Sequence, residues 1–367
     1  MSRRLTYDRY IFGAAILILV VGLVMIYSAS ALIAAQKIHR DDPYYFVVRQ
    51  CIWLFAGGAL MFFLMNIDTH HFKNVKVIYG LLVSICVALV VVLFQAPING
   101  THRWIVLPAF QLQPSEFAKP VMVLFLASFL SRKEERIDDL TGTLLPLGTV
   151  MAIVAGLILL EPDFGTAATI VVVASSLLFV AGISWKRIAL FSLALVPAAI
   201  ALIMGAEYRR DRLLTFLNPE ADPLGKGFQA MQSLIAIGTG GLTGLGIGNG
   251  RQKLFFLPEP HTDFIFSIIG EEVGFIGAFA LLAVFTLLVW RGFRLALLSA
   301  NDRFAYYAVL GFTLMIGFQV LLNVSVTLCL LPTKGLPLPL VSYGGSSLIT
   351  SLCAVGMLLN FSQRSTG

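Results

Sequence analysis

Charged residues are scarce in this chain. Asp, Glu, Lys and Arg make up 13% of its 367 residues, whereas hydrophobic residues make up 58%. In a soluble domain about a quarter of the residues are charged, because the surface must face water. The shortage of charge, together with a mean hydropathy of +0.87, excludes a soluble protein and predicts one that lies almost wholly within a membrane.

Several motifs with a defined chemistry are also missing. The four cysteines lie in apolar runs without metal-ligand spacing, which favours small core residues over a disulfide framework. No G-x-x-x-x-G-K sequence occurs, so neither ATP-driven pumping nor a nucleotide cofactor has support. No S-x-x-K sequence occurs either, which leaves the chain without an acyl-transfer serine of that type.

The hydrophobic residues are organised in runs of roughly 20, the length that crosses a bilayer as a helix. They do not alternate as barrel strands would. We therefore predict an all-α polytopic membrane protein, a single integral membrane domain over residues 1–367. The first run is longer than a signal-peptide core, so it is expected to remain as a span. The ten predicted spans are 10–33, 47–66, 76–94, 115–130, 143–160, 164–182, 187–205, 264–290, 304–330 and 340–360.

Lys and Arg are distributed unevenly between the loops. Most of those in short loops lie on the side of the N-terminus, among them Lys73, Arg132 and Arg187. Cytoplasmic loops carry such an excess, so both termini are predicted to be cytoplasmic. The long loop 206–262, between spans seven and eight, is then extracytoplasmic. This bias also accounts for the net charge of +6, so no nucleic-acid partner is implied.

The first large outward loop carries Arg103, and the next span begins with Glu116 and Lys119. Its helix is expected to start at Pro114 or Ser115. Glu116 and Lys119 share one helix face and can pair, which gives a purely structural interpretation. The functional interpretation is that Arg103 and Lys119 hold an anionic group, because charges at the edge of a span mark a ligand path.

Glu161 and Asp163 lie in a tight turn between two spans. Asp163 can cap the helix that follows. Alternatively, both residues offer carboxylate oxygens of the kind that Mg²⁺ or Mn²⁺ binds, although two carboxylates are a weak indication of a metal site.

A glycine-rich segment over residues 238–253 ends in Arg251 and Lys253. Dense glycine allows backbone N–H groups to approach a phosphate closely, so both cations are candidates for binding it. The other interpretation is a flexible loop. The apolar stretch 227–238 before it is predicted to form a short helix.

Asp263 follows at the mouth of a long apolar run. A carboxylate there is costly unless it has a function, and it is our candidate for a general base. On a continuous helix Glu271 would lie roughly 12 Å deeper, so we expect Glu271 or Glu272 to pair internally. His261 is a weaker candidate for a second base.

The last outward segment, residues 331–347, contains three prolines and is predicted to be rigid and non-helical. Irregular backbone at membrane depth is tolerated only where protein or a water-filled cavity covers it. Lys334, Ser342 and Ser346 are therefore candidates for lining a cavity. Close packing of small residues is the structural alternative.

These stretches, in this order, resemble the SEDS family (shape, elongation, division and sporulation proteins) of the FtsW/RodA type. The last motif is more similar to the division branch, FtsW, than to the elongation branch, RodA, apart from Pro337, where division members commonly carry Thr. The motifs that carry the resemblance are Asn99–Trp104 with Gln113–Glu116, Glu161–Thr166, Gly244–Lys253 with His261–Phe264, and Pro332–Ser347.

The resemblance implies a peptidoglycan glycosyltransferase that uses lipid II in the bacterial cytoplasmic membrane. It implies a class B penicillin-binding protein as the transpeptidase partner, within a divisome or elongasome of other membrane proteins. It assigns the essential acidic residue to Asp263, and it matches the family's outer arginine, glutamate and lysine to Arg103, Glu116 and Lys119.

The residues are compatible with this chemistry, since the reaction needs a base for the acceptor hydroxyl and cations for a departing pyrophosphate. Two other classes remain open. A transporter of lipid-linked precursors would use the same polar cavity, and it predicts polar residues at mid-depth and on the cytoplasmic face. A non-catalytic scaffold would need no aspartate at the groove.

Overall fold

The structure is a computed structural model that describes residues 7–35, 42–98, 101–108, 110–187, 227–254, 257–332 and 335–365, with a few isolated positions between 189 and 216. It is built from helices, as predicted, with one antiparallel pair of two-residue strands, β1 (Ile105–Val106) and β2 (Gln111–Leu112). The α-helices are α1 (Arg9–Ile33), α2 (Tyr45–Asn66), α3 (Thr69–Lys73), α4 (Val75–Leu93), α5 (Pro114–Lys133), α6 (Leu145–Leu160), α7 (Phe164–Val180), α10 (Phe228–Gly240), α11 (Ile265–Leu298), α12 (Arg303–Thr327) and α13 (Gly345–Ser365).

Seven helical stretches in the described part of the chain are long and apolar enough to cross a membrane. They correspond to predicted spans one, two, three, five, eight, nine and ten. Helix α7 is shorter, and α5 begins with the Glu116 and Lys119 turn and ends in basic residues, so both fall outside that group. The seventh predicted span, 187–205, and most of the predicted loop at 206–226 lie outside the described residues.

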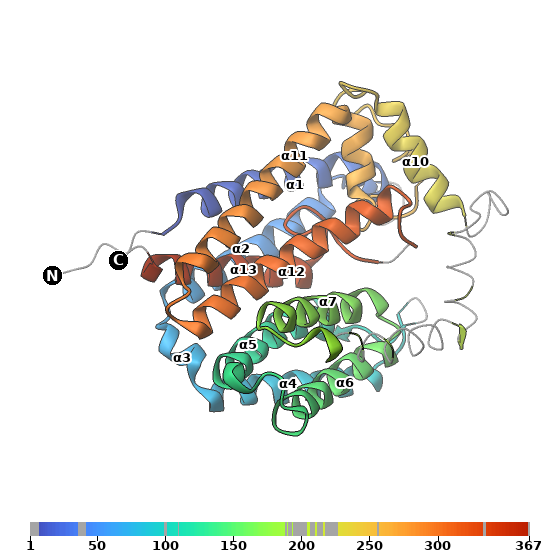
Figure 1. The fold of residues 1–367 in the computed structure, drawn as a ribbon. Helices are drawn as coiled ribbons and strands as arrows, with labels where there is room; N and C mark the ends of the chain where they lie inside the picture. Colours follow the sequence, from blue (N-terminus) through green and yellow to red (C-terminus); the bar gives the residue numbers. More distant parts are fainter. Residues whose placement is uncertain are drawn as a thin grey trace.

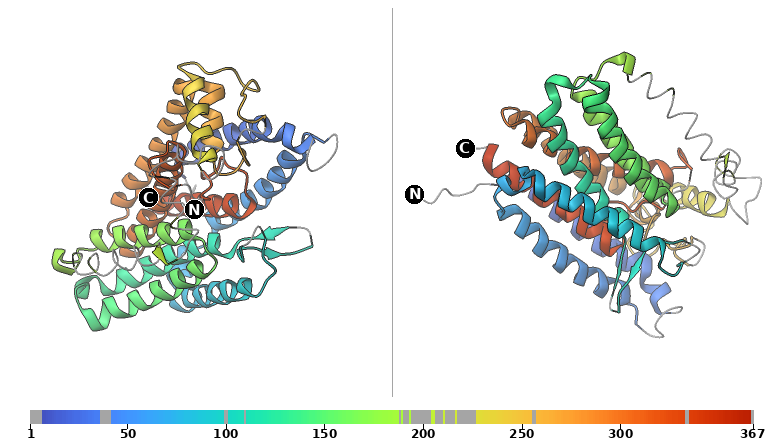
Figure 2. Two further views of the ribbon diagram at one scale, coloured as in Figure 1. Left: turned by 90° about the vertical axis from the view of Figure 1, so that its right-hand side faces the viewer. Right: turned by 90° about the horizontal axis from the view of Figure 1, so that it is seen from below.

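The helices form two groups that α12 joins. Helices α1, α2, α11, α12 and α13 pack together in one group, and α4, α5, α6 and α7 pack together in the other (Figure 1). Helix α12 also packs against α5 and α7. The strand pair projects from the edge of the helices (Figure 2).

Helix α1 begins and α13 ends at the same end of the array (Figure 1), where the Asp8 N–H donates to Ser362 Oγ at 3.0 Å. This agrees with the prediction that both termini lie on one side. We call the opposite end the far end. The connections before α5 and α7, the turn before α11 and the segment between α12 and α13 all lie toward it.

Helix α11 is broken at Gly274, whose φ of 70° and ψ of −172° are not helical. Such a backbone conformation favours glycine, which has no Cβ. The first two N–H groups after the break donate to carbonyls of the loop 241–246, and two N–H groups of that loop donate to the carbonyls just before the break. The loop thereby satisfies backbone groups that a helix end leaves unpaired. The break divides α11 into a short arm, residues 265–273, and a long arm, residues 275–298.

The short arm runs toward the far end. At its start, Asn323 Nδ2 donates to the Asp263 carbonyl oxygen at 2.8 Å. One turn later, Ser267 Oγ lies 2.6 Å from Ser233 Oγ, which donates to the carbonyl of Thr327 at 2.7 Å. Since Thr327 ends α12 and Asn323 precedes it by one turn, the short arm rises alongside the end of α12.

The expectation that Glu271 lies deeper than Asp263 is therefore wrong. The expectation assumed one continuous helix, whereas the break at Gly274 reverses the chain. Asp263 lies at the inner start of the short arm, and Glu271 lies nearer the far end.

Candidate functional site

Asp263 lies in a turn before the short arm, where its side chain is half-buried. Gly335 approaches it closely: a Cβ built on Gly335 would lie 3.1 Å from Asp263 Oδ2. The carboxylate thus lies against the backbone of the proline-rich segment. Two non-helical stretches, this segment and the turn that carries Asp263, form the candidate site. Lys334, the predicted cation of this segment, lies outside the described residues.

The segment from Leu336 to Val341 is buried apart from the half-buried Pro337, which agrees with the prediction that protein covers this irregular backbone. It penetrates far into the array: a Cβ on Gly22, midway along α1, would lie 2.8 Å from the Leu340 carbonyl oxygen. Apolar side chains thus bury a non-helical segment at the level of the middle of α1.

The two predicted cavity-lining serines make structural hydrogen bonds. Ser342 Oγ donates to the Thr262 carbonyl at 2.7 Å and accepts from the Leu338 N–H at 2.8 Å. Ser346 Oγ accepts from the Gln113 N–H at 3.0 Å and is 2% exposed. Both hydroxyls therefore tie segments of the site together, and their role in binding substrate stays a prediction.

Glu116 and Lys119 form a buried ion pair near the start of α5, with Nζ 2.8 Å from Oε2 and side chains 3% and 1% exposed. Thr350 Oγ1 also donates to Glu116, at 3.2 Å. A small cavity beneath Lys119 has room for about one water molecule, with a volume of ≈ 10 Å³. This geometry supports the structural interpretation of the pair.

Arg103 holds the turn between α6 and α7. Its Nε donates to the Glu161 carbonyl at 3.0 Å, and one terminal nitrogen donates to the Pro162 carbonyl. A guanidinium has five N–H donors, so the half-buried Arg103 side chain retains donors for an anion.

Asp163 caps α7, as one of the two interpretations predicted. It accepts from the Thr166 N–H at 3.2 Å, and from Ser115 Oγ and Gln113 Nε2 at 3.0 Å each. Its carboxylate is therefore already well provided with donors.

Glu161 is fully buried, and neither carboxyl oxygen has a hydrogen-bond partner among the residues that the structure describes. Burial and then the neighbouring Asp163 carboxylate raise the pKa of Glu161 to about 9, against the opposing charge of Arg103. The described part of the chain holds no group of three His, Cys, Asp or Glu side chains that could bind a metal ion, so Glu161 and Asp163 as ligands of Mg²⁺ or Mn²⁺ stay a prediction.

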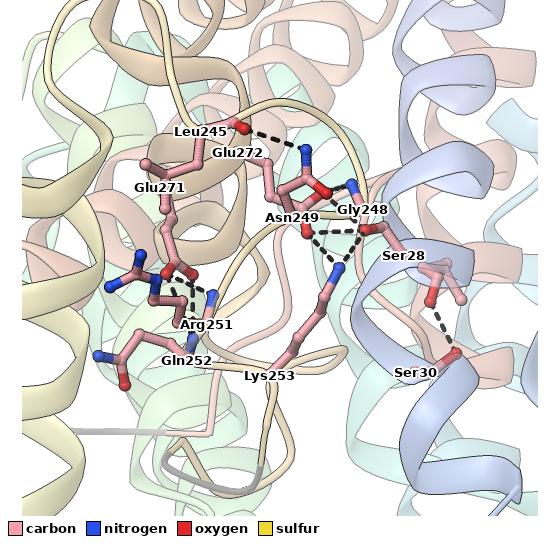
Figure 3. Close-up of polar contacts among 11 residues, drawn as sticks. Ser28, Ser30, Leu245, Gly248, Asn249, Arg251, Gln252, Lys253, Glu271 and Glu272 are labelled. Carbon is pink, nitrogen blue, oxygen red and sulfur yellow. Dashed lines mark hydrogen bonds and ion pairs between the residues drawn. The ribbon is translucent and has the colours of Figure 1, made fainter.

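The glycine-rich loop binds carboxylates of the protein itself (Figure 3). The N–H groups of Arg251 and Gln252 donate to Glu271 Oε1 at 2.7 and 3.2 Å. Close backbone approach was predicted correctly, but these N–H groups are already used by a glutamate. Their use as an open phosphate cradle is a wrong prediction.

Lys253 belongs to the same network. Its Nζ lies 2.7 Å from Glu272 Oε1, and the two side chains are 6% and 0% exposed. Ser28 of α1 donates to Glu272 at 2.6 Å, and the Gly248 N–H donates at 3.0 Å (Figure 3). The expected internal pairing of Glu272 is confirmed. Lys253 is not available as a phosphate ligand, because its charge is neutralised in a buried pair.

His261 is buried between aromatic rings, with centroid distances of 4.3 Å to Phe46 and 5.5 Å to Tyr343. Burial lowers its pKa to about 4, so the ring is neutral at pH 7. This packing supports a structural role for His261 rather than that of a second base.

The structure thus brings part of the predicted site together. Asp263 lies by the buried segment, whose Leu336 packs on Gly165 beside the Asp163 cap. Arg251 and Lys253 lie instead at the far end of the short arm. Sequence reasoning missed Asn323, although a polar residue inside an apolar span is itself a signal for a functional site.

Comparison with known proteins gives a consistent result. The family described as "Cell cycle protein" (FtsW, RodA, SpoVE) matches residues 8–367. A "Probable peptidoglycan glycosyltransferase FtsW" of Geobacter metallireducens is 42% identical, with 98% of this chain and 96% of the relative covered. "Stage V sporulation protein E" of Bacillus subtilis is 41% identical, with 99% of each covered.

Two kinds of solved structure are similar as well. One, described as "Structural coordination of polymerization and crosslinking by a peptidoglycan synthase complex", has a TM-score of 0.80 and 34% identity over 98% of each chain. The rod shape determining protein RodA of Thermus thermophilus has a TM-score of 0.71 and 31% identity, also over 98% of each chain.

Proposed function

Because the chain belongs to the FtsW/RodA/SpoVE family of cell cycle proteins, we propose that it is a glycosyltransferase that polymerises lipid II into peptidoglycan strands. The reaction takes place at the outer face of the bacterial cytoplasmic membrane. The observation that carries the proposal is the half-buried carboxylate of Asp263, which lies in the turn before the short arm of α11 and against the backbone of a buried non-helical segment. The peptidoglycan glycosyltransferase named among the relatives supports the reaction class.

Asp263 acts as the general base. It removes the proton from the acceptor sugar hydroxyl as that oxygen attacks the anomeric carbon of the donor. The bond between this carbon and the pyrophosphate oxygen breaks, and undecaprenyl pyrophosphate leaves with the electron pair. The transition state has oxocarbenium character, as in glycoside hydrolysis. A single displacement on an α-linked donor gives a β-linked strand.

Arg103 is the cation that we assign to the leaving pyrophosphate. It is half-buried, and two of its donors already fix it on the turn between α6 and α7. A preorganised cation stabilises charge as it develops, because it needs no rearrangement during the reaction. Arg251, whose side chain is exposed, is a second candidate at the far end. Glu116 and Lys119 form a buried ion pair near the start of α5.

We also propose a class B penicillin-binding protein as the partner. This chain has no S-x-x-K sequence, so it lacks the acyl-transfer serine that cross-linking by such an enzyme uses. The similar complex, described as coordinating polymerization and crosslinking, supports a partnership of this kind. Co-purification of the two proteins and faster polymerisation in the pair are the expected results. If they do not associate and the rate is unchanged, this partnership is wrong.

Purified protein in detergent tests the reaction. Fluorescent lipid II should be converted into long glycan chains, resolved by gel electrophoresis, without a second compartment. A transporter or a scaffold would leave lipid II unpolymerised under the same conditions. Absence of polymer, both alone and with the partner present, would overturn the proposed function.

A further inference from the structure

The turn that carries Asp263 is held by three consecutive carbonyl groups. The His261 carbonyl accepts from the Tyr343 N–H at 2.9 Å, and the Thr262 carbonyl accepts from Ser342 Oγ at 2.7 Å. The Asp263 carbonyl accepts from Asn323 Nδ2 at 2.8 Å. Three successive hydrogen bonds to its carbonyl groups fix the backbone of this turn. They therefore also fix the direction in which the Asp263 side chain leaves the backbone.

Asn323 joins this turn to the opposite wall of the site. Its Nδ2 donates a second hydrogen bond, at 2.7 Å, to the carbonyl of Leu336. Leu336 follows Gly335, the residue whose backbone lies against the Asp263 carboxylate. The side-chain amide of Asn323 therefore sets the distance between the turn that carries Asp263 and the segment that begins at Gly335.

The burial of Asn323 is costly by itself. The residue is 1% exposed, and its Oδ1 has no hydrogen-bond partner within the described ranges. Burying an unpaired acceptor is unfavourable. The Nδ2 group of Asn323 must therefore contribute something that an apolar side chain could not. It holds the carbonyl groups of Asp263 and Leu336 at a fixed distance and orientation.

We infer that Asn323 is a positioning residue, which aims the Asp263 carboxylate at the acceptor hydroxyl, with Ser342 as its second support. This inference rests on the proposed function. It assigns Asn323 no contact with substrate. Because a misplacement of about 1 Å can lower a rate about 10²-fold, loss of the amide should lower kcat much more than it changes KM.

The chain offers a matched control. Asn360 of α13 is 3% exposed, and its Nδ2 donates to the carbonyls of Leu64 and Ile67 at 2.7 Å each. It also donates to the Met65 carbonyl at 3.2 Å, so it binds the carbonyls at the end of α2 instead of joining two separate stretches. Asn323→Ala and Asn360→Ala each remove one buried side-chain amide. A difference in kcat between the two variants therefore depends on where the amide lies and not on the loss of a buried amide as such.

We expect Asn323→Ala to lower kcat for lipid II polymerisation by about 10²-fold with KM changed less than about threefold. Asn360→Ala should leave both constants within about threefold of wild type, with a similar drop in thermal stability. Asn323→Asp, which keeps the shape but replaces a donor by an acceptor, should behave like Asn323→Ala. Equal activity in the two alanine variants would overturn the inference.

A milder pair covers the case in which Asn323→Ala does not fold. Ser342→Ala removes one support of the turn, and we expect kcat to fall by about tenfold, a part of the loss expected for misplacement. Ser362 is its control, because its hydroxyl likewise donates to a carbonyl, that of Leu359 at 2.7 Å, and accepts from an N–H, that of Asp8 at 3.0 Å. Equal kcat values for Ser342→Ala and Ser362→Ala would count against positioning.

Hydrogen exchange separates this inference from the proposed function. Amide exchange in residues 257–264 and 336–343 should rise in Asn323→Ala and stay unchanged in Asn360→Ala, whether or not the protein polymerises anything. Unchanged exchange in Asn323→Ala would show that no clamp exists. Faster exchange with full kcat would show a clamp that does not position Asp263. A wild-type protein without polymerase activity would instead overturn the proposed reaction.

Discussion

Replacing Lys253 by Met should destabilise the protein strongly. The change removes the ammonium group that lies 2.7 Å from Glu272 Oε1, and it leaves a carboxylate whose side chain is 0% exposed. Ser28 and the Gly248 N–H still donate to Glu272, but they carry no charge. Breaking a buried ion pair on one side costs about 3–5 kcal/mol, because the remaining charge is uncompensated.

Removal of both charges should cost much less than the two single changes together. A neutral pair of similar volume is often as stable as the buried ions that it replaces. We therefore expect the double variant Lys253→Met/Glu272→Gln to be more stable than Lys253→Met, with a coupling free energy of at least about 2 kcal/mol.

Unfolding of the purified protein by SDS, followed by tryptophan fluorescence, measures these free energies. The control is Lys73→Met, which breaks the ion pair with Asp302 at a surface where the side chains are 40% and 44% exposed. Exposed pairs contribute about 1 kcal/mol or less. The account is contradicted if Lys253→Met lowers the free energy of unfolding no more than Lys73→Met does. It is also contradicted if the effects of Lys253→Met and Glu272→Gln are additive in the double variant.

Three further predictions concern the site and its frame. Burial holds the pKa of His261 at about 4, so the unfolded chain binds the proton first and stability should fall as the pH drops from about 6.5 toward 4; His261→Phe should remove that slope in a pH series of unfolding curves. Cys329 adopts a φ of +54° just after α12, where glycine is favoured; Cys329→Gly relieves this strain but removes the half-buried thiol that donates to the Ala230 carbonyl, so it should change stability by less than about 1 kcal/mol in the same assay, and a larger loss would contradict this account. Arg103→Ala should slow polymerisation by about 10–10³-fold, whereas Lys119→Ala should mainly destabilise the protein, which steady-state kinetics and unfolding together can separate.

The sequence predicted the helices well because each apolar run is long and ends in polar or helix-breaking residues. Helix α5 begins at Pro114, and α10 covers the short helix expected before the glycine-rich loop. The N-cap of Asp163 was also one of the predicted alternatives. These features depend on neighbouring residues only, so local rules were sufficient.

The break at Gly274 could not be predicted in this way. The run around it is apolar apart from Ser267, Glu271 and Glu272. It contains glycine at 270, 274 and 277, and nothing in the sequence distinguishes the one at which the helix breaks. The backbone partners that stabilise the break come from a loop about 30 residues earlier in the chain. For the same reason the pairing of Glu272 with Lys253 and Ser28, and hence the depth of Asp263, required the three-dimensional structure.

The most direct test of the account is Asp263→Asn in the purified protein, with lipid II as the substrate. The substitution keeps the shape of the side chain and removes its basicity. The rate of glycan polymerisation should fall by about 10²–10⁴-fold, the contribution of a general base, while the unfolding curve stays close to that of wild type. Near-normal polymerisation by a folded Asn variant would contradict the assignment of Asp263 as the base.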